Sequence, residues 1–330
     1  MARSERPTMV DVAADAGVSL KTVSRVINLV PTVDPALAER VQASMERLGF
    51  RRNMVAANLR AGKSDLIGLV TADLSNAFYT TIASGVSRVA VENGYQVMMA
   101  SSEESADTER TLALDLCQRR AGGLLVVPTR ADHAYLAAEI RLGTPVVFID
   151  RPAEGLEADA VLIDNRGGAA AAIADLVARG HRRIGLLLDA LAIFTMTERL
   201  EGARAAFAEA GLEADIIVTD LHRPAQAAEA ASALLASADP PTALFCANNR
   251  ITVGAVEAIL RAGSAVDVAG FDDFEVSHLL PFEVLIVDYD TRALGERAAE
   301  LLLRRMDGDD SPLERVLLPT ELVRRGGALV

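Results

Sequence analysis

The sequence lacks the features that mark exported, membrane-spanning or disulfide-stabilised proteins. No stretch of its 330 residues approaches the roughly 18 consecutive uncharged apolar residues that a membrane-spanning helix requires. Arg3 and Arg6 are followed by acidic residues rather than by the apolar core of a signal peptide, so we expect no export from the cytoplasm. The two cysteines, Cys117 and Cys246, lie in apolar segments and predict buried free thiols rather than a disulfide framework.

Residues that carry enzyme chemistry are also sparse. The sequence has no phosphate-binding glycine loop, no Gly-x-Ser-x-Gly turn and no His/Cys set at metal-ligand spacing. Its scattered histidines are expected to be structural or surface residues, and these are His133, His181, His222 and His278. We therefore expect no catalytic residue, no metal and no cofactor. Two alternatives stay open: an α/β enzyme acting on a sugar, which the lack of an acid/base pair disfavours, and an effector-binding protein without a role on DNA.

Charge is distributed unevenly along the chain. Residues 1–63 hold ten Lys/Arg and six Asp/Glu, a net charge of +4, although the whole chain has a net charge of −13. Residues 64–330 therefore carry −17. Only the small basic segment would be attracted to a polyanion such as nucleic acid, so the two segments suggest two functions. On charge alone, a solvated basic surface is an equally good explanation.

Capping residues and apolar spacing predict three short helices in residues 1–52. Each helix follows a residue whose side chain can cap it, and Gly17 and Gly49 suit the turns after the first and third. The predicted helices are 9–16 after Thr8, 20–28 after Ser19, and 35–48 after Asp34, with Pro35 at the first helical position.

A helix, a four-residue turn and a second helix form the geometry that places the second helix in the major groove of DNA. Val23 is expected to bury that helix against the first. Arg25 can offer two donors to guanine O6 and N7, while its polar neighbours can reach phosphates or base edges. The residues on or near the free face are Leu20, Lys21, Thr22, Ser24, Arg25 and Asn28. A three-helix packing module without a DNA partner is the alternative.

Residues 53–63 predict a linker. Asn53–Ala61 consists largely of helix formers and is followed by Gly62, but so short a helix is unstable alone in water. We expect it to form only when another element supports it.

From Leu66 onward, short apolar runs alternate with helical stretches, which predicts an α/β body of parallel sheets covered on both faces. The length and the hydrophobic content of 51% are sufficient for more than one core. The expected strands are 66–71, 95–100, 123–127 and 145–149, then a second series at 161–163, 184–188, 216–218, 243–246 and 266–269. A last helix at 291–306 and a strand at 314–318 are expected to return to the first series. The predicted first lobe is 64–160 with 291–320, and the second is 161–290 with 321–330.

Polar residues follow many of these strands, where ligands of parallel sheets bind. Many Asp and Asn acceptors suit a neutral polyol or sugar better than a phosphate. They are Asp73, Ser101, Ser102, Thr129, Arg130, Asp150 and Arg151 in the first lobe, and Asp189, Asp220, Asn248, Arg250, Asp272 and Asp273 in the second. Each one taken alone can instead be a helix cap or a turn residue.

Several motifs resemble, in the same order, those of LacI/GalR-type transcription regulators. They cover nearly the whole chain and include Val10–Asn28, 47–53, 59–63, Asp73–Phe78, Asp150–Arg151, 163–169, 180–185, 199–202 and Gly270–Asp273. The resemblance implies a helix-turn-helix headpiece joined to a two-lobed core like that of periplasmic binding proteins. It implies a homodimer in the bacterial cytoplasm that binds a palindromic operator in double-stranded DNA and is associated with the nucleoid when bound. It also implies a repressor that is controlled by a small carbohydrate-like effector and has no membrane partner.

The resemblance also assigns individual residues. The linker would be a hinge helix that pairs with its dimer mate in the minor groove, with Leu59 wedged between base steps. The implied DNA contacts are Thr8, Ser19, Leu20, Lys21, Thr22, Ser24, Arg25, Asn28, Asn53, Ala56 and Leu59. The implied effector contacts are Asp73, Phe78, Asp150, Thr197, Arg199, Asn248, Arg250, Asp272 and Tyr289.

Some positions depart from the family pattern and leave the effector open. Thr197 stands where the family often has an arginine, Arg250 follows Asn248–Asn249 in place of Asn-Asp, and Asp288–Tyr289 replaces Arg-Gln. Arg250 could bind a carboxylate, which would favour a sugar acid. The sequence also leaves open whether the effector induces or represses, and a dimer is favoured over a tetramer.

Overall fold

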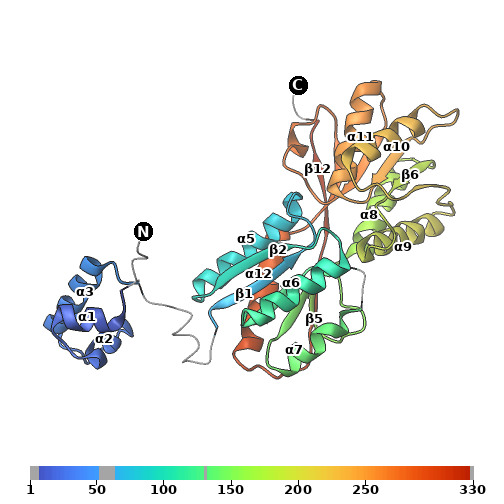
Figure 1. The fold of residues 1–330 in the computed structure, drawn as a ribbon. Helices are drawn as coiled ribbons and strands as arrows, with labels where there is room; N and C mark the ends of the chain where they lie inside the picture. The colour runs from blue at the N-terminus through green and yellow to red at the C-terminus, as the bar shows by residue number, and fades with distance from the viewer. Residues whose placement is uncertain (1–6, 52–63, 130–131, 328–330) are drawn as a thin grey trace. The chain divides into compact units, whose positions relative to one another are not determined.

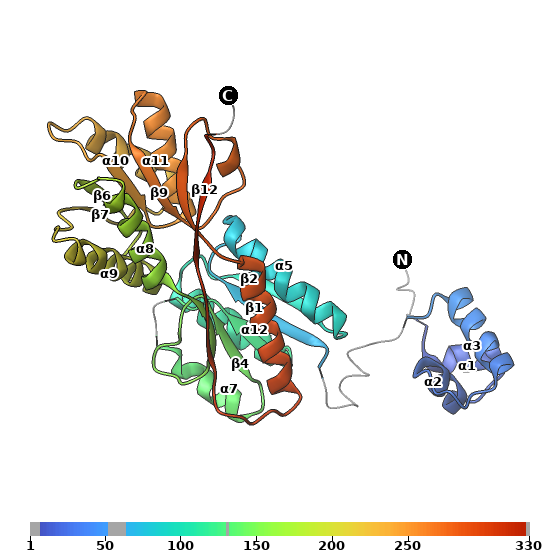
Figure 2. The same ribbon diagram turned by 180° about the vertical axis from the view of Figure 1, so that it is seen from behind.

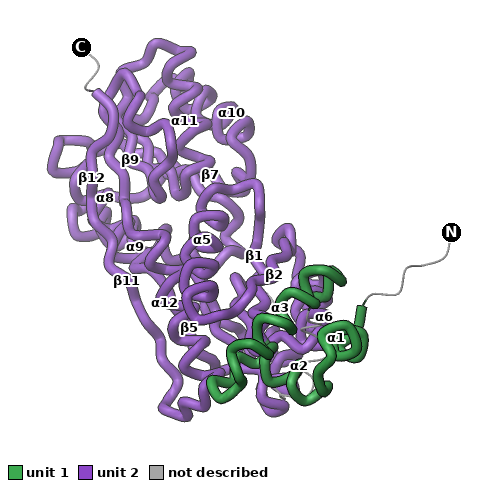
Figure 3. Tube along the Cα trace, turned by 90° about the vertical axis from the view of Figure 1, so that its left-hand side faces the viewer, with its two compact units in different colours: residues 1–64 green, residues 65–330 purple. Residues whose placement is uncertain are grey.

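The computed structural model describes residues 7–51, 64–129 and 132–327 and divides the chain into two compact units, residues 1–64 and 65–330 (Figure 3). The predicted linker contacts Asn53, Ala56 and Leu59, and the strand-end residue Arg130, lie outside the described residues. Of the helices that are described, none has both the length and the apolar character needed to cross a bilayer.

The described residues of the first unit form three helices: α1 (Met9–Ala16), α2 (Leu20–Ile27) and α3 (Pro35–Leu48). The predicted caps are confirmed, because the side chains of Thr8, Ser19 and Asp34 each accept a hydrogen bond from a backbone amide of the first turn. Gly17 and Gly49 end α1 and α3 in the left-handed conformation, with φ of 61° and 63°.

One buried valine from each helix forms the centre of the headpiece core, and these are Val12, Val23 and Val41. Val23 therefore packs α2 against its neighbours, as the sequence predicted. A polar contact adds to this core, since Arg40 Nη2 of α3 donates to the carbonyl oxygen of Ala16 at 2.6 Å. That bond satisfies a carbonyl at the end of α1, which has no partner within its own helix.

The second unit contains two six-stranded sheets with helices on both faces (Figures 1 and 2). The strands of the first sheet are β1 (Leu66–Thr71), β2 (Gln96–Ser101), β3 (Gly123–Val126), β4 (Val146–Ile149), β5 (Asp159–Ile163) and β11 (Arg315–Leu318). Those of the second are β6 (Ile184–Leu187), β7 (Ile216–Val218), β8 (Ala243–Cys246), β9 (Asp267–Phe271), β10 (Val284–Asp288) and β12 (Glu321–Arg325). The strand orders are β11-β5-β4-β3-β1-β2 and β12-β10-β9-β8-β6-β7. All pairings are parallel except that of β10 with β12.

The helices follow the alternation that the sequence predicted. Those of the first lobe are α5 (Ala77–Glu92), α6 (Ala106–Gln118), the short pair η1 (His133–Leu136) and α7 (Ala137–Arg141), and α12 (Thr291–Met306). Those of the second are α8 (Asn165–Ala178), α9 (Phe194–Glu209), α10 (Pro224–Leu235), α11 (Asn249–Ala262) and η2 (Ser277–Leu279). The predicted return of the last helix and strand is confirmed, because α12 packs against α5 and β11 pairs with β5.

One expectation about the lobes is wrong, and two strands were missed. The run at 161–163 was expected to open the second lobe, but β5 pairs with β4 in the first sheet, and the chain crosses only afterwards, where Asp164 caps α8. An apolar run of this kind fits either sheet, and pairing with β4 decides between them. The strands β10 and β12 were not expected, and β12 is a partly exposed edge strand that carries charged residues rather than an apolar run.

Close backbone contact joins α5 to α12 in the first lobe. A Cβ atom added at Gly295 would collide with the carbonyl oxygen of Ile82, and one at Gly85 would collide with the carbonyl oxygen of Arg292. Only glycine permits this approach from both sides. The contact fixes the position of α5, whose first turn lies at the cleft between the lobes.

Candidate functional sites

The second helix of the headpiece has one apolar and one polar face. Val23 and Val26 are buried, while the predicted contact residues Leu20, Lys21 and Asn28 are exposed. Thr22, Ser24 and Arg25 are half-buried at the border between these faces. The predicted DNA-contact residues that the structure describes therefore lie on or beside the free face of α2. The exceptions are Thr8 and Ser19, which cap α1 and α2.

Arg25 is oriented by a neighbouring side chain. Its Nη2 donates to Thr32 Oγ1 at 2.5 Å, in the loop between α2 and α3. This bond uses one of the five N–H donors of a guanidinium, and a two-pronged contact with guanine needs two others. Arg25 thus has the donors that reading a base requires.

In the second unit, Arg199 of α9 is the centre of a buried polar network. Its Nε donates to Asn165 Oδ1 at 2.8 Å and its Nη1 donates to the carbonyl oxygen of Ala247 at 2.5 Å. Both Nη atoms also donate to the carboxylate of Asp272, at 3.1 and 3.2 Å. The guanidinium carbon lies 3.6 Å from the ring centre of Phe271, a cation–π contact. Arg199 therefore has little freedom to move and holds Asp272 at the end of β9.

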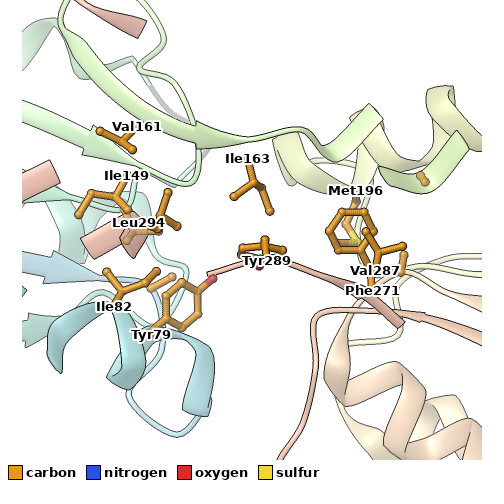
Figure 4. Packing of buried hydrophobic residues seen from close by; sticks show 14 of the residues in the cluster. Tyr79, Ile82, Ile149, Val161, Ile163, Met196, Phe271, Val287, Tyr289 and Leu294 are labelled. Atoms are coloured by element: carbon orange, nitrogen blue, oxygen red, sulfur yellow. The ribbon is translucent and has the colours of Figure 1, made fainter. Parts of the chain in front are cut away.

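Tyr289 connects this network to the first lobe. Its hydroxyl donates to Asp272 Oδ1 at 2.7 Å, and burial, followed by the nearby charge of Asp272, raises the pKa of Tyr289 well above its usual value. Its ring lies 6.3 Å from that of Phe271 in the second lobe and 6.4 Å from that of Phe78 on α5. Figure 4 shows Tyr289 between Tyr79 on one side and Phe271 on the other. The residue therefore lies where the lobes meet.

Asp150, at the end of β4, provides an acceptor without a donor. The residue is 3% exposed, and among the described residues no group donates to its Oδ1. Burial raises the pKa of this carboxyl to about 6, against the attraction of Arg151 and Arg199. A buried carboxylate oxygen without a donor costs free energy.

Arg151 lies beside Asp150 and is held by bonds to neighbouring side chains. Its two Nη atoms each donate to Glu104 at 2.8 Å, and Nη2 also donates to the hydroxyl of Tyr79 at 2.9 Å. Its Nε lies 3.4 Å from Asp150 Oδ2. The guanidinium is thus already neutralised by carboxylates of the chain.

Two of the predicted effector residues bind each other. Arg250 Nη2 lies 2.6 Å from Asp73 Oδ2 and donates to the hydroxyl of Ser75 at 2.6 Å. A guanidinium with a carboxylate partner attracts a ligand carboxylate only weakly, so the argument for a sugar acid loses its main support. Asn248 caps α11 through its Oδ1, which accepts from the amide of Ile251 at 2.9 Å.

Thr197 lies apart from these groups. It is exposed, and its hydroxyl donates to the carbonyl oxygen of Leu191 at 2.8 Å, which steadies the turn before α9. Although it is only two positions from Arg199, a step of two residues along a helix points to a different face. The described contacts of Thr197 give it no part in the Arg199 network.

Sequence reasoning missed three side chains that bond to Arg199 or Arg151. Asn165 stood inside a recognised motif, so its place could have been found there, and Tyr79 adjoins the predicted Phe78. Glu104 belongs to a loop, and its sequence gives no signal of the bond to Arg151. Among the described residues, no cluster of three or more His, Cys, Asp or Glu side chains could hold a metal ion.

Two adjoining cavities, of about 610 and 540 Å³, lie between the lobes and are within the usual size range of small-molecule sites. Both are lined by Ala77, Asn249 and Phe274, and the larger also reaches Phe78 and Asp272. The space between the lobes therefore gives access to at least part of the predicted effector set.

Comparison with known proteins covers nearly the whole chain. Residues 8–53 match the family model described as bacterial regulatory proteins, lacI family, and residues 64–325 match that of periplasmic binding proteins and the sugar binding domain of the LacI family. The transcriptional regulator GalR of Escherichia coli K12 is 31% identical, over 96% of this chain and 94% of its own.

Solved structures of the same family are also similar to this chain. The lac repressor dimer bound to operator and the anti-inducer ONPF has a TM-score of 0.87 at 26% identity, over 98% of this chain and 99% of that one. The complex of the regulator CelR with cellobiose has a TM-score of 0.71 at 30% identity, over 97% and 99%. These relatives are transcriptional regulators rather than enzymes, and the resemblance seen in the sequence is confirmed. The chain belongs to the LacI family of bacterial DNA-binding transcription regulators.

Proposed function

We propose that this regulator is a homodimeric repressor whose affinity for a palindromic operator is controlled by a neutral, polyhydroxylated effector bound between the lobes. Residues 1–52 would read DNA, 53–63 would form the hinge, and 64–330 would bind the effector and the second subunit. The protein would act in the bacterial cytoplasm, on the nucleoid when bound to its operator.

The unpartnered Oδ1 of Asp150 is the observation that carries the effector proposal. A ligand hydroxyl supplies the missing hydrogen bond, whereas a phosphate or carboxylate brings a second negative charge to a buried anion. The nearby cations give such an anion little compensation, because Arg151, Arg199 and Arg250 each already contact a carboxylate. CelR was solved with cellobiose, a neutral polyhydroxylated molecule, which supports the same class of ligand.

The DNA side of the proposal rests on the headpiece. A net charge of only +4 in residues 1–63 gives one head few phosphate contacts, so a single half-site should bind weakly. Two heads on a two-fold symmetric site double those contacts. The lac repressor, which was solved as a dimer on its operator, supports this arrangement.

The first sheet offers an edge for the second subunit. Its edge strand β2 carries Met98 and Met99, each 41% exposed, and the nearby end of α5 carries the exposed Val91. Exposed apolar side chains on a strand at the edge of a sheet favour association with another protein surface. A second copy of the chain is the partner that the proposed palindrome requires.

Effector binding would change the relative position of the first lobes and therefore the cost of pairing the two hinges. Such coupling between sites is reciprocal and amounts to about 1–3 kcal/mol. A ligand with equal affinity for the two states would change nothing, whatever its strength of binding.

A two-step experiment tests the proposal. Thermal unfolding of the full chain is measured with neutral sugars, polyols, sugar acids and sugar phosphates, and each ligand that stabilises it is added to a complex with a selected inverted-repeat duplex. We expect a neutral compound to raise the unfolding temperature and to change the operator dissociation constant severalfold. The proposal fails if only anionic compounds bind, or if no inverted repeat is preferred over random DNA.

A further inference from the structure

We propose that Arg250 and Asn249 of the second lobe form an interlobe clasp with Asp73, Ser75 and Asn76 of the first, and that this clasp sets how readily the cleft opens. The clasp is a property of the ligand-free chain. Only its effect on effector binding depends on the function proposed above.

Three polar contacts make the clasp. Arg250 Nη2 lies 2.6 Å from Asp73 Oδ2 and 2.6 Å from Ser75 Oγ, and Asn249 Nδ2 donates to Asn76 Oδ1 at 3.0 Å. The side chains of Arg250 and Asp73 are 28% and 18% exposed, so water screens their attraction only in part. These contacts join segments more than 170 residues apart in the sequence.

Local structure holds both sides of the clasp in place. On the first lobe, Asp73 Oδ1 accepts from the amide of Ser75 at 2.7 Å, and Asn76 caps α5. On the second lobe, Asn249 Oδ1 accepts from the amide of Arg250 at 2.8 Å, which leaves its Nδ2 to reach across. Each side of the clasp is therefore the ordered start of a helix rather than a free loop.

The chain crosses between the lobes at three places, after β5, between β10 and α12, and between β11 and β12. The clasp lies on none of these crossovers. Motion of the lobes about the crossovers must lengthen the Arg250–Asp73 and Asn249–Asn76 contacts, while the crossovers themselves stay bonded. The clasp therefore favours the closed arrangement and is lost on opening.

Loss of the clasp should lower the ratio of closed to open molecules about fivefold to tenfold, as expected for a partly buried, charge-assisted hydrogen bond. An effector that binds the closed arrangement would then have a higher apparent dissociation constant and would leave faster, because fewer molecules are ready to hold it.

The chain contains no tryptophan, so one introduced tryptophan provides a unique fluorescence signal. Phe274 is half-buried and lines one cavity together with Ser75, Asn76 and Arg250, so F274W places the probe beside the clasp. Acrylamide quenching of the full chain, without any effector, is compared for F274W alone and with R250Q or R261Q. Arg261 is a matched control, because it lies on the same helix and pairs with Glu257 with its side chain 73% exposed.

We expect R250Q to raise the quenching constant severalfold and R261Q to leave it unchanged. D73N should act as R250Q does, and the double variant D73N/R250Q should be no more open than either single variant. Additive effects, or an R250Q variant that is quenched like its parent, would overturn the clasp.

Hydrogen exchange of peptides spanning 73–80 and 247–253 in chains that keep Phe274 gives a second measurement if the probe disturbs packing. R250Q should speed exchange in both peptides, and equal exchange in R250Q and R261Q refutes the clasp. Because no effector is present, this outcome is independent of whether a sugar binds. If these tests support the clasp but the protein binds no neutral sugar, the clasp is retained and only the proposed effector is rejected.

Discussion

Replacing Asp150 by asparagine should make the ligand-free protein more stable and unable to hold its effector. Asp150 is 3% exposed, and burial raises its pKa from about 3.8 to about 6. The folded chain therefore binds this proton more tightly than the unfolded chain does. Stability should be unaffected by this group below about pH 4, fall as the pH rises towards 6, and stay lowered above it.

The size of the effect follows from that shift. Two pKa units at 1.36 kcal/mol each give a cost of about 3 kcal/mol at neutral pH, an order-of-magnitude value because Arg151 and Arg199 share the same site. The neutral amide of D150N avoids the cost at nearly the same shape. For a unit of this size, about 3 kcal/mol corresponds to an increase in unfolding temperature of about 5–10 °C.

Thermal unfolding of the wild-type chain and D150N at pH 4.5, 6 and 8, without effector, measures the difference. We expect D150N to be more stable by about 1 kcal/mol at pH 4.5 and by about 3 kcal/mol at pH 8. Effector-induced stabilisation should be lost in D150N, since the amide replaces an acceptor with a donor. A D150N protein less stable than wild type at pH 8 would show that attraction from the neighbouring arginines exceeds the cost of burial, and the reasoning would be refuted.

Three further substitutions test other parts of the molecule. Arg25→Ala should weaken binding to the operator by about 1–3 kcal/mol and to random DNA much less, as measured by competition in a mobility-shift assay; equal losses would remove its role in reading bases. Asp272→Asn should abolish effector-induced thermal stabilisation and leave operator binding intact, although Arg199 loses a charged partner; retained stabilisation would place the effector elsewhere. Gly295→Ala should lower stability by at least about 2 kcal/mol in chemical denaturation, because the new methyl group meets the carbonyl of Ile82, and an unchanged midpoint would contradict the close helix contact.

Local signals allowed the headpiece to be predicted almost residue by residue. The helix boundaries depend on Thr8, Ser19 and Asp34 and on two glycines, and each of these acts within a turn of its own position. Most strands of the body were also found as apolar runs, but β10, itself a buried apolar run, was missed. Their assignment to sheets failed at β5, because pairing with β4 is not encoded within the run itself.

The candidate site, too, could be predicted from the sequence only in part. Asp150 and Asp272 follow strands at positions where ligands of parallel sheets bind, so the sequence could nominate them, and both adopt positive φ there, 69° and 67°. What the sequence could not supply is which charges neutralise each other. The sequence allowed Arg250 to bind a ligand carboxylate, yet its partner is Asp73, more than 170 positions earlier and in the other lobe.

The segment Asp73–Phe78 connects the two proposed functions of the molecule. It carries the first-lobe side of the clasp, and its last residue packs near the Tyr289 ring. A ligand hydroxyl that replaced the Tyr289 hydroxyl on Asp272 would free that ring and change its contact with Phe78. The segment also follows directly from β1, whose other end begins next to the proposed hinge at 53–63. β1 itself is hydrogen-bonded to β2 on one side and to β3 on the other. We therefore propose that a ligand at Asp272 changes the contacts of Asp73–Phe78, the segment that follows β1.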